Sequence, residues 1–153
     1  MNVQLRLDDL TDPRIAELLE EHLRDMRAVS PPESVHALDL AQLKRPEIKF
    51  WSAWDGSQLV GCGALKRLDT RHAELKSMRT ANAHRRRGLG KLILEHIMND
   101  ARKSGYLRMS LETGSMAFFE PARSLYASYG FVRCAPFADY TDDPNSVCMT
   151  RLL

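Results

Sequence analysis

The hydrophobic and polar positions repeat with two different periods along the chain, and these periods predict strands and helices. Strict alternation over Val3 to Leu7 predicts a short strand. Asp12 and Pro13 then suit the start of a helix, and apolar residues follow at helical spacing as far as Met26. The sequence Ser30-Pro31-Pro32 is expected to end this helix.

The rest of the chain continues the succession of strands and helices. The clearest apolar stripe at helical spacing predicts a helix over Gly88 to Lys103, and a shorter helix is expected from Pro121 to Gly130. The remaining predicted elements are a helix over Leu38 to Lys44 and strands over Ile48 to Trp54, Leu59 to Leu68, Glu74 to Thr80, Tyr106 to Leu111, Phe131 to Ala135 and Ser146 to Leu153. This order predicts one mixed α/β sheet with helices on both faces.

Size, charge and cysteine content narrow the class of protein. The 153 residues suit a single domain spanning residues 1–153, and the net charge of +2 argues against a surface built for nucleic acid. No stretch approaches the length of a membrane-spanning helix, and the first residues lack the apolar core of a signal peptide. We therefore expect a cytoplasmic protein with reduced thiols, with no membrane or nucleic-acid partner.

The segment between residues 74 and 91 contains the strongest chemical signal. A predicted strand leads into a loop rich in arginine and glycine, and the loop leads directly into the long helix. Unpaired N–H groups at a helix start attract phosphate, and Gly88 and Gly90 allow the backbone to approach it closely. Because Ile93 stands where the dinucleotide fingerprint needs a third glycine, that motif is excluded. The alternative interpretation is a helix start beside a solvated basic loop.

Two motifs together resemble a known superfamily. Arg85-x-x-Gly88-x-Gly90 after a strand is similar to the coenzyme A pyrophosphate loop of the GNAT N-acetyltransferases, and the segment from Ala122 to Phe131 is similar to their Ala-x-x-Leu-Tyr-x-x-x-Gly-Phe signature. The resemblance covers nearly the whole chain. It implies a mixed, mostly antiparallel twisted sheet of about six or seven strands flanked by about four helices. Segments 30–38, 136–140 and 143–147 resemble the YsnE-like branch of this superfamily.

The resemblance also implies roles for individual residues, with acetyl-CoA as cosubstrate. The main chain of Met78, Arg79 and Thr80 would hold the pantetheine arm, and the Met78 N–H would stabilise the oxyanion. Tyr126 would protonate the leaving thiolate. Many relatives carry asparagine where this chain has Phe119, so that pantetheine contact is expected from Glu112, Thr113 or the main chain. The pyrophosphate would be held by Arg85, Arg86, Arg87, Gly88, Leu89, Gly90 and Lys91.

Transfer to an amine also needs a base, because a free alkylammonium loses its proton only near pH 10. Glu74 is the first candidate, since a period of two places it on one side of the strand with Lys76, Met78 and Thr80. The alternative is a rim carboxylate paired with Lys76 or Arg79. For Tyr126, whose phenol stays protonated at pH 7, the alternative is a core tyrosine.

The loop before the second helix and the tail after Pro136 are expected to contact the acceptor. Glu33, Ser34, His36 and Tyr140 are the predicted acceptor-binding residues, and His36 is an alternative base. The aspartates of the tail, Asp139, Asp142 and Asp143, would attract a cationic amine. Alternatively, His36 packs or caps, and the tail is a solvated surface loop.

These observations predict an acetyl-CoA-dependent N-acetyltransferase acting on a small-molecule amine by direct attack in a ternary complex. The main alternative is a non-catalytic module of the same fold that binds or senses acyl-CoA. No histidine and carboxylate spacing suggests a metal site, and no cysteine lies at an electropositive helix start that would favour an acyl-enzyme. Monomer and homodimer both remain open, although dimers are common among small folds.

Overall fold

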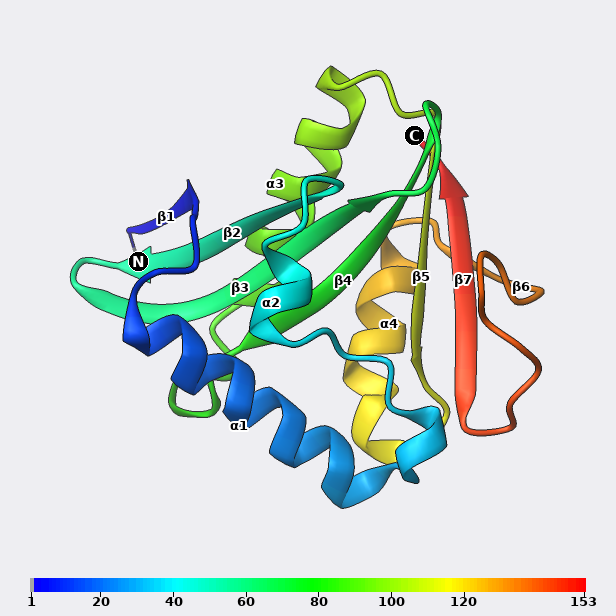
Figure 1. Ribbon diagram of the computed structural model, residues 1–153, viewed down its shortest axis with the longest axis horizontal. Helices are drawn as coiled ribbons and strands as arrows, with labels where there is room; N and C mark the ends of the chain where they lie inside the picture. The colour runs from blue at the N-terminus through cyan, green and yellow to red at the C-terminus, as the bar shows by residue number, and fades with distance from the viewer. Residues whose placement is uncertain (1) are drawn as a thin grey trace.

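A computed structural model describes residues 2–153, in which seven strands form one sheet in the order β1-β2-β3-β4-β5-β7-β6 (Figure 1). Only β4 and β5 are parallel, and the other neighbouring pairs are antiparallel. This confirms the predicted mixed, mostly antiparallel sheet. The strands are β1 (Val3–Leu7), β2 (Ile48–Asp55), β3 (Gln58–Arg67), β4 (His72–Thr80), β5 (Arg108–Gly114), β6 (Val132–Cys134) and β7 (Ser146–Leu152).

Four α-helices cover the two faces of the sheet, as predicted. Helices α1 (Pro13–Val29) and α2 (Leu40–Leu43) lie on one face, and α3 (Leu89–Lys103) and α4 (Glu120–Ser128) lie on the other (Figure 1). Each pair of helices buries its own apolar cluster against the strands. No helix within residues 2–153 has the length and hydropathy needed to cross a membrane. Three 3₁₀ turns complete the fold, namely η1 (Pro32–Ser34), η2 (Asn82–His84) and η3 (Ala117–Phe119).

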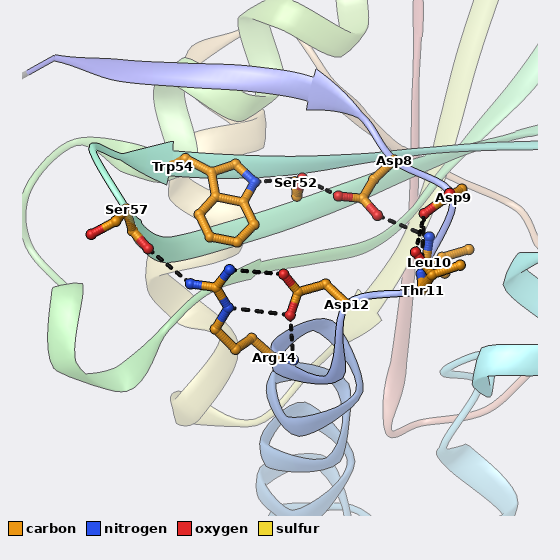
Figure 2. A network of polar contacts seen from close by, with 9 residues as sticks. All are labelled: Asp8, Asp9, Leu10, Thr11, Asp12, Arg14, Ser52, Trp54 and Ser57. Carbon is orange, nitrogen blue, oxygen red and sulfur yellow. Dashed lines mark hydrogen bonds and ion pairs between the residues drawn. The ribbon is translucent and has the colours of Figure 1, made fainter.

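A polar network fixes the start of α1 against the β2–β3 hairpin (Figure 2). The Asp12 carboxylate accepts a hydrogen bond from the Arg14 N–H at 2.9 Å, which caps the helix as its sequence predicts. The Arg14 guanidinium donates to the Ser57 carbonyl at 2.9 Å and stacks 4.5 Å from the centre of the Trp54 ring. In the same network, Ser52 donates to Asp8 and accepts from the Trp54 indole. These contacts set the position of α1 on its face of the sheet.

Strands β4 and β5 separate along their length. They pair only over His72 to Glu74 of β4, opposite Arg108 to Ser110 of β5, although both strands run further. Figure 1 shows them meeting near one end of the sheet and diverging toward the other. Beyond the paired residues, main-chain groups on the facing edges of both strands lack a strand partner and are available to a ligand.

A bulge in β4 reverses the side to which its residues point. Cys62 faces Arg79 and Ala64 faces Lys76, so the single Gly63 of β3 opposes two residues of β4. Ser77, one of those two, has a positive φ of 52°. Met78 therefore packs with the α3 cluster. The prediction that Glu74, Lys76 and Met78 share one side is wrong for Met78, because strict alternation does not continue through a bulge.

Two glycines of β3 allow α3 to lie close to the sheet. A Cβ at Gly61 would stand 2.7 Å from the Arg79 carbonyl oxygen and 2.8 Å from Ile93 Cδ1. A Cβ at Gly63 would stand 2.6 Å from Ile97 Cδ1. The close approach of α3 matters for the site because the first residues of this helix face the gap between β4 and β5.

We expect Gly61→Ala to lower the free energy of unfolding by about 2 kcal/mol, because the new methyl group would overlap a backbone carbonyl that cannot rotate away. Gly56→Ala is the matched control, since a Cβ there has nothing within 4 Å and only its φ of 60° opposes it. That control should lose about 1 kcal/mol. Urea unfolding of both variants measures the difference, and equal losses would contradict the proposed packing constraint.

Candidate active site

A cavity of about 620 Å³ occupies the gap between β4 and β5 and opens toward the helices on both faces. Figure 1 shows α4 lying across this gap on one face, with α1 and the segment leading to α2 on the other. Most of the predicted site residues line the cavity, whereas Arg87, Glu33 and Ser34 do not. The residues that do are Glu74, Met78, Arg79, Thr80, Arg85, Arg86, Gly88, Leu89, Gly90, Lys91, Tyr126, His36 and Tyr140.

One end of the cavity is basic and lies at the start of α3. Gly88 caps this helix in the left-handed region with a φ of 75°, and the preceding Arg86 has a φ of 65°. The first N–H groups of the helix therefore open onto the cavity, beside the exposed side chains of Arg85 and Arg86. This arrangement suits a phosphate or pyrophosphate group.

Arg87, by contrast, turns away from the cavity. Its guanidinium donates to Asp55 at 2.5 Å and lies 2.7 Å from the Nδ1 of His84. The Arg87 side chain thus ties the loop to the end of β2. Of the three successive arginines, Arg85 and Arg86 line the cavity, and Arg85 also forms an ion pair with Asp25 of α1 at 3.6 Å.

Arg79 lines the cavity, but its guanidinium binds two carboxylates of α1. It is 6% exposed and forms ion pairs with Glu21 at 2.8 Å and Asp25 at 2.5 Å. The Glu21 carboxylate also accepts from the Asn82 N–H at 2.8 Å. These pairs attach the diverging end of β4 to α1, which leaves the main chain of Arg79 for any ligand contact.

Tyr126 lies on α4 and lines the cavity. It is 7% exposed, and its ring packs edge-on against Phe131. Its hydroxyl makes no hydrogen bond to any other side chain or main-chain group within residues 2–153. Burial raises the pKa of this phenol, so the hydroxyl is protonated at neutral pH. The structure therefore places a proton donor without a protein partner on the cavity wall.

Glu74 forms a buried cluster on the opposite side of the sheet from α4. The Tyr140 hydroxyl donates to Glu74 Oε2 at 2.5 Å, and the Lys76 ammonium donates to the same oxygen at 3.1 Å. Lys76 also donates to the Tyr140 hydroxyl at 2.8 Å. Of the two alternatives considered for Glu74, pairing with Lys76 is present. The carboxylate is only 2% exposed, so it is an interior group and not a rim carboxylate.

The tail from Pro136 to Asn145 covers this side of the cavity. Tyr140 reaches Glu74, and the His36 ring packs edge-on against the Tyr140 ring with centroids 5.0 Å apart. Ser34 donates to the Asp143 carboxylate at 2.5 Å, so Ser34 holds the tail and does not line the cavity. Glu33 is exposed outside it. Burial lowers the pKa of His36, which keeps this imidazole neutral at pH 7.

Glu112 lines the cavity on β5, although the sequence suggested it only as a pantetheine contact. Burial raises its pKa to about 7, and its carboxylate accepts a hydrogen bond from the Ser146 hydroxyl at 2.6 Å. The predicted strand ended at Leu111, whereas β5 runs to Gly114. Had the strand been extended, its alternation would have placed Leu111 in the core and Glu112 on the opposite side.

His22 of α1 also lines the cavity. Its buried Nδ1 has no hydrogen-bond partner within residues 2–153, and burial lowers its pKa to about 4. The ring is therefore neutral at pH 7. The part of the chain that the structure describes contains no group of three or more His, Cys, Asp or Glu side chains placed to hold a metal ion.

Comparisons with known proteins agree with this geometry. The sequence model of the acetyltransferase (GNAT) family matches residues 15–131. The chain is 60% identical to the uncharacterized N-acetyltransferase YsnE of Bacillus subtilis over 99% of its length and 100% of the relative. It is 51% identical to the uncharacterized N-acetyltransferase YedL of Escherichia coli over 93% of its length and 89% of that relative.

A solved structure shares the whole fold. A GNAT family acetyltransferase of Elizabethkingia anophelis, crystallised with acetyl-CoA bound, superposes with a TM-score of 0.72 at 18% identity over 99% of both chains. The family match covers both sequence motifs, and the relative from Bacillus subtilis matches at full length. The chain therefore belongs to the GNAT family of acetyltransferases, in the branch that includes YsnE.

Proposed function

We propose that this acetyltransferase transfers the acetyl group of acetyl-CoA to a small-molecule amine, by direct attack in a ternary complex. The observation that supports this most strongly is a single cavity between β4 and β5 with a basic helix start at one end and carboxylates at the other. A coenzyme and an amine entering from the two faces would meet in the gap between the strands. The net charge of +2 is consistent with a cytoplasmic metabolite as acceptor in place of nucleic acid.

In this proposal the coenzyme occupies the face formed by α3 and α4. The N–H groups after Gly88, together with Arg85, Arg86 and Lys91, hold the pyrophosphate. The pantetheine arm follows the unpaired edge of β4 beside Met78, Arg79 and Thr80. The N–H near Met78 donates to the thioester carbonyl, where negative charge develops during attack.

Tyr126 is proposed as the acid that completes the transfer. When the amine attacks, the C–N bond forms and the C–S bond breaks, and the thiolate takes the Tyr126 proton. A phenol is still protonated at neutral pH, so it has a proton to give to the thiolate as the C–S bond breaks. An acyl-cysteine route is unfavourable, because burial raises the pKa of Cys62 to about 12 and that of Cys148 to about 11.

Arg86→Ala is expected to weaken coenzyme A binding by about tenfold, because a guanidinium beside the pyrophosphate contributes a charge-assisted contact. Arg87→Ala is the matched control, since this side chain is paired with Asp55 outside the cavity. Its affinity should stay within about twofold of the wild type. Calorimetry with coenzyme A measures both, and an equal loss in the two variants would contradict the assignment of the basic end.

Tyr126→Phe should bind acetyl-CoA with unchanged affinity and lose about 100-fold in turnover with the best amine, because only the transferable proton is removed. A thiol-release assay across an amine panel, run beside calorimetry on both proteins, measures the two quantities. Equal turnover would remove Tyr126 from the mechanism. Tight binding of coenzyme A by the wild type without turnover on any amine would favour the sensing module.

A further inference from the structure

We propose that Glu112, and not Glu74, binds the ammonium group of the acceptor and takes its proton before attack. This inference rests on the proposed amine acetyltransfer and assigns the base within it. It also defines the acceptor class, which is a cationic amine with no carboxylate next to the reacting nitrogen.

The position of Glu112 is the first argument. Leu111 before it is buried in the α3 and α4 cluster, so strand alternation places Glu112 on the other side of β5, where the acceptor is proposed to enter. It lines the cavity at the edge that diverges from β4. An amine bound at Glu112 would lie beside the gap between β4 and β5. It would reach the thioester carbonyl through that gap.

The hydrogen bonds of the two carboxylates are the second argument. Glu74 Oε2 accepts from both the Lys76 ammonium and the Tyr140 hydroxyl, and these two donors hold it as the charged partner of an ion pair. Glu112 accepts from a single neutral hydroxyl, that of Ser146, through Oε2. Its Oε1 has no partner within residues 2–153 and is free to accept from a ligand.

The charges around Glu112 support proton uptake. Lys76 and Glu74 of β4 and Asp143 of the tail act on it, with Ser146 of β7 in direct contact. Lys76 is engaged by Glu74, so its charge is largely balanced. Burial raises the pKa of Glu112 to about 7, which brings its basicity closer to that of an alkylamine and keeps part of the group ionised at pH 7.

Glu112, Tyr126 and water are sufficient to complete the proton balance. An N–H bond of the ammonium breaks and its proton moves to the Glu112 carboxylate, which leaves a lone pair on nitrogen. The lone pair forms the C–N bond, the C–S bond breaks, and the thiolate takes the Tyr126 proton. The new amide nitrogen returns a proton to Tyr126, and Glu112 releases its proton to water. The net products are the amide, coenzyme A and one proton.

The acceptor class follows from the same charges. Arg79 is paired with Glu21 and Asp25, and Lys76 is paired with Glu74. His36 and His22 are neutral at pH 7, because burial lowers the pKa of each. With Arg85, Arg86 and Lys91 occupied by the pyrophosphate, a substrate carboxylate beside the reacting nitrogen would meet Glu112 with no unpaired cation of the cavity lining within residues 2–153 to balance it.

The test measures kcat/KM against pH for amines paired with the amino acids that carry the same side chain, namely 2-phenylethylamine with phenylalanine and 3-methylbutylamine with leucine. We expect the amines to be preferred by more than about tenfold. For the amines, the wild-type value should rise with unit slope up to about pH 7 and then level off, because Glu112 must be ionised to accept a proton.

Glu112→Gln keeps the shape of the side chain and an acceptor for Ser146. This variant should lower kcat/KM at pH 7 by about 100-fold or more, and its pH profile should no longer change slope near pH 7. Glu20→Gln, on the exposed side of α1, makes the same change of charge. It should keep the wild-type kcat/KM and the change of slope near pH 7. Retention of the change of slope in Glu112→Gln would overturn this inference, and its loss in Glu74→Gln would assign the base to Glu74 instead.

Thermal unfolding gives a readout that does not depend on turnover. A buried carboxyl whose pKa is raised in the folded state destabilises the fold as pH rises from its unfolded pKa toward 7. The Tm of Glu112→Gln relative to the wild type should therefore be higher at pH 8 than at pH 4. A constant difference would contradict the buried environment and overturn the proposal.

The two proposals fail in different ways. Absence of turnover by the wild type with every amine overturns the amine acetyltransfer, and the proton transfer with it. Turnover by the wild type that survives in Glu112→Gln overturns the assignment of Glu112 alone. A preference for the amino acids over their paired amines overturns the acceptor class.

Discussion

The divergence of β4 from β5 is the constraint on which the rest of the molecule depends. A parallel pair that stays together over only three residues leaves two strand edges unpaired inside the fold. The separation is maintained because each strand is held elsewhere, β4 by β3 and by the Arg79 ion pairs to α1, and β5 by its full pairing with β7. A buried ion pair is weak evidence of stability, but it fixes a geometry, and here it fixes the open end of the gap.

The distribution of charged groups in the cavity follows from the divergence of β4 from β5. The side of the gap under α3 holds the start of a helix and the guanidinium groups of Arg85 and Arg86, whereas the other side holds Glu74 and Glu112 from the two diverging strands. Each carboxylate needs its own compensation because Glu74 is buried and Glu112 is partly buried. Glu74 has an ammonium and a phenol, whereas Glu112 has one hydroxyl and a raised pKa. Two carboxylates in one cavity are thereby given different chemical properties.

Sequence patterns predicted much of the fold, because periodicity and caps are local. The stripe and glycines around α3, the alternating strands and the two family motifs all depend on residues near one another in the chain. The bulge at Ser77 was not predictable, since it depends on how Gly63 of another strand packs. Likewise, the partner of Arg87 is Asp55, 32 positions away, and no local pattern distinguishes it from Arg85 and Arg86.

Two short segments cover the carboxylates, namely the one around η1 and the tail before β7. The Ser34–Asp143 hydrogen bond joins them, and Tyr140 anchors the tail to Glu74. Neither segment contributes to the helix start that faces the opposite end. Substitutions in these two segments can accordingly change the carboxylate end of the cavity while the basic end at the start of α3 stays intact. Divergence among close relatives in substrate preference then requires only surface-loop changes, which the scaffold tolerates at little cost in stability.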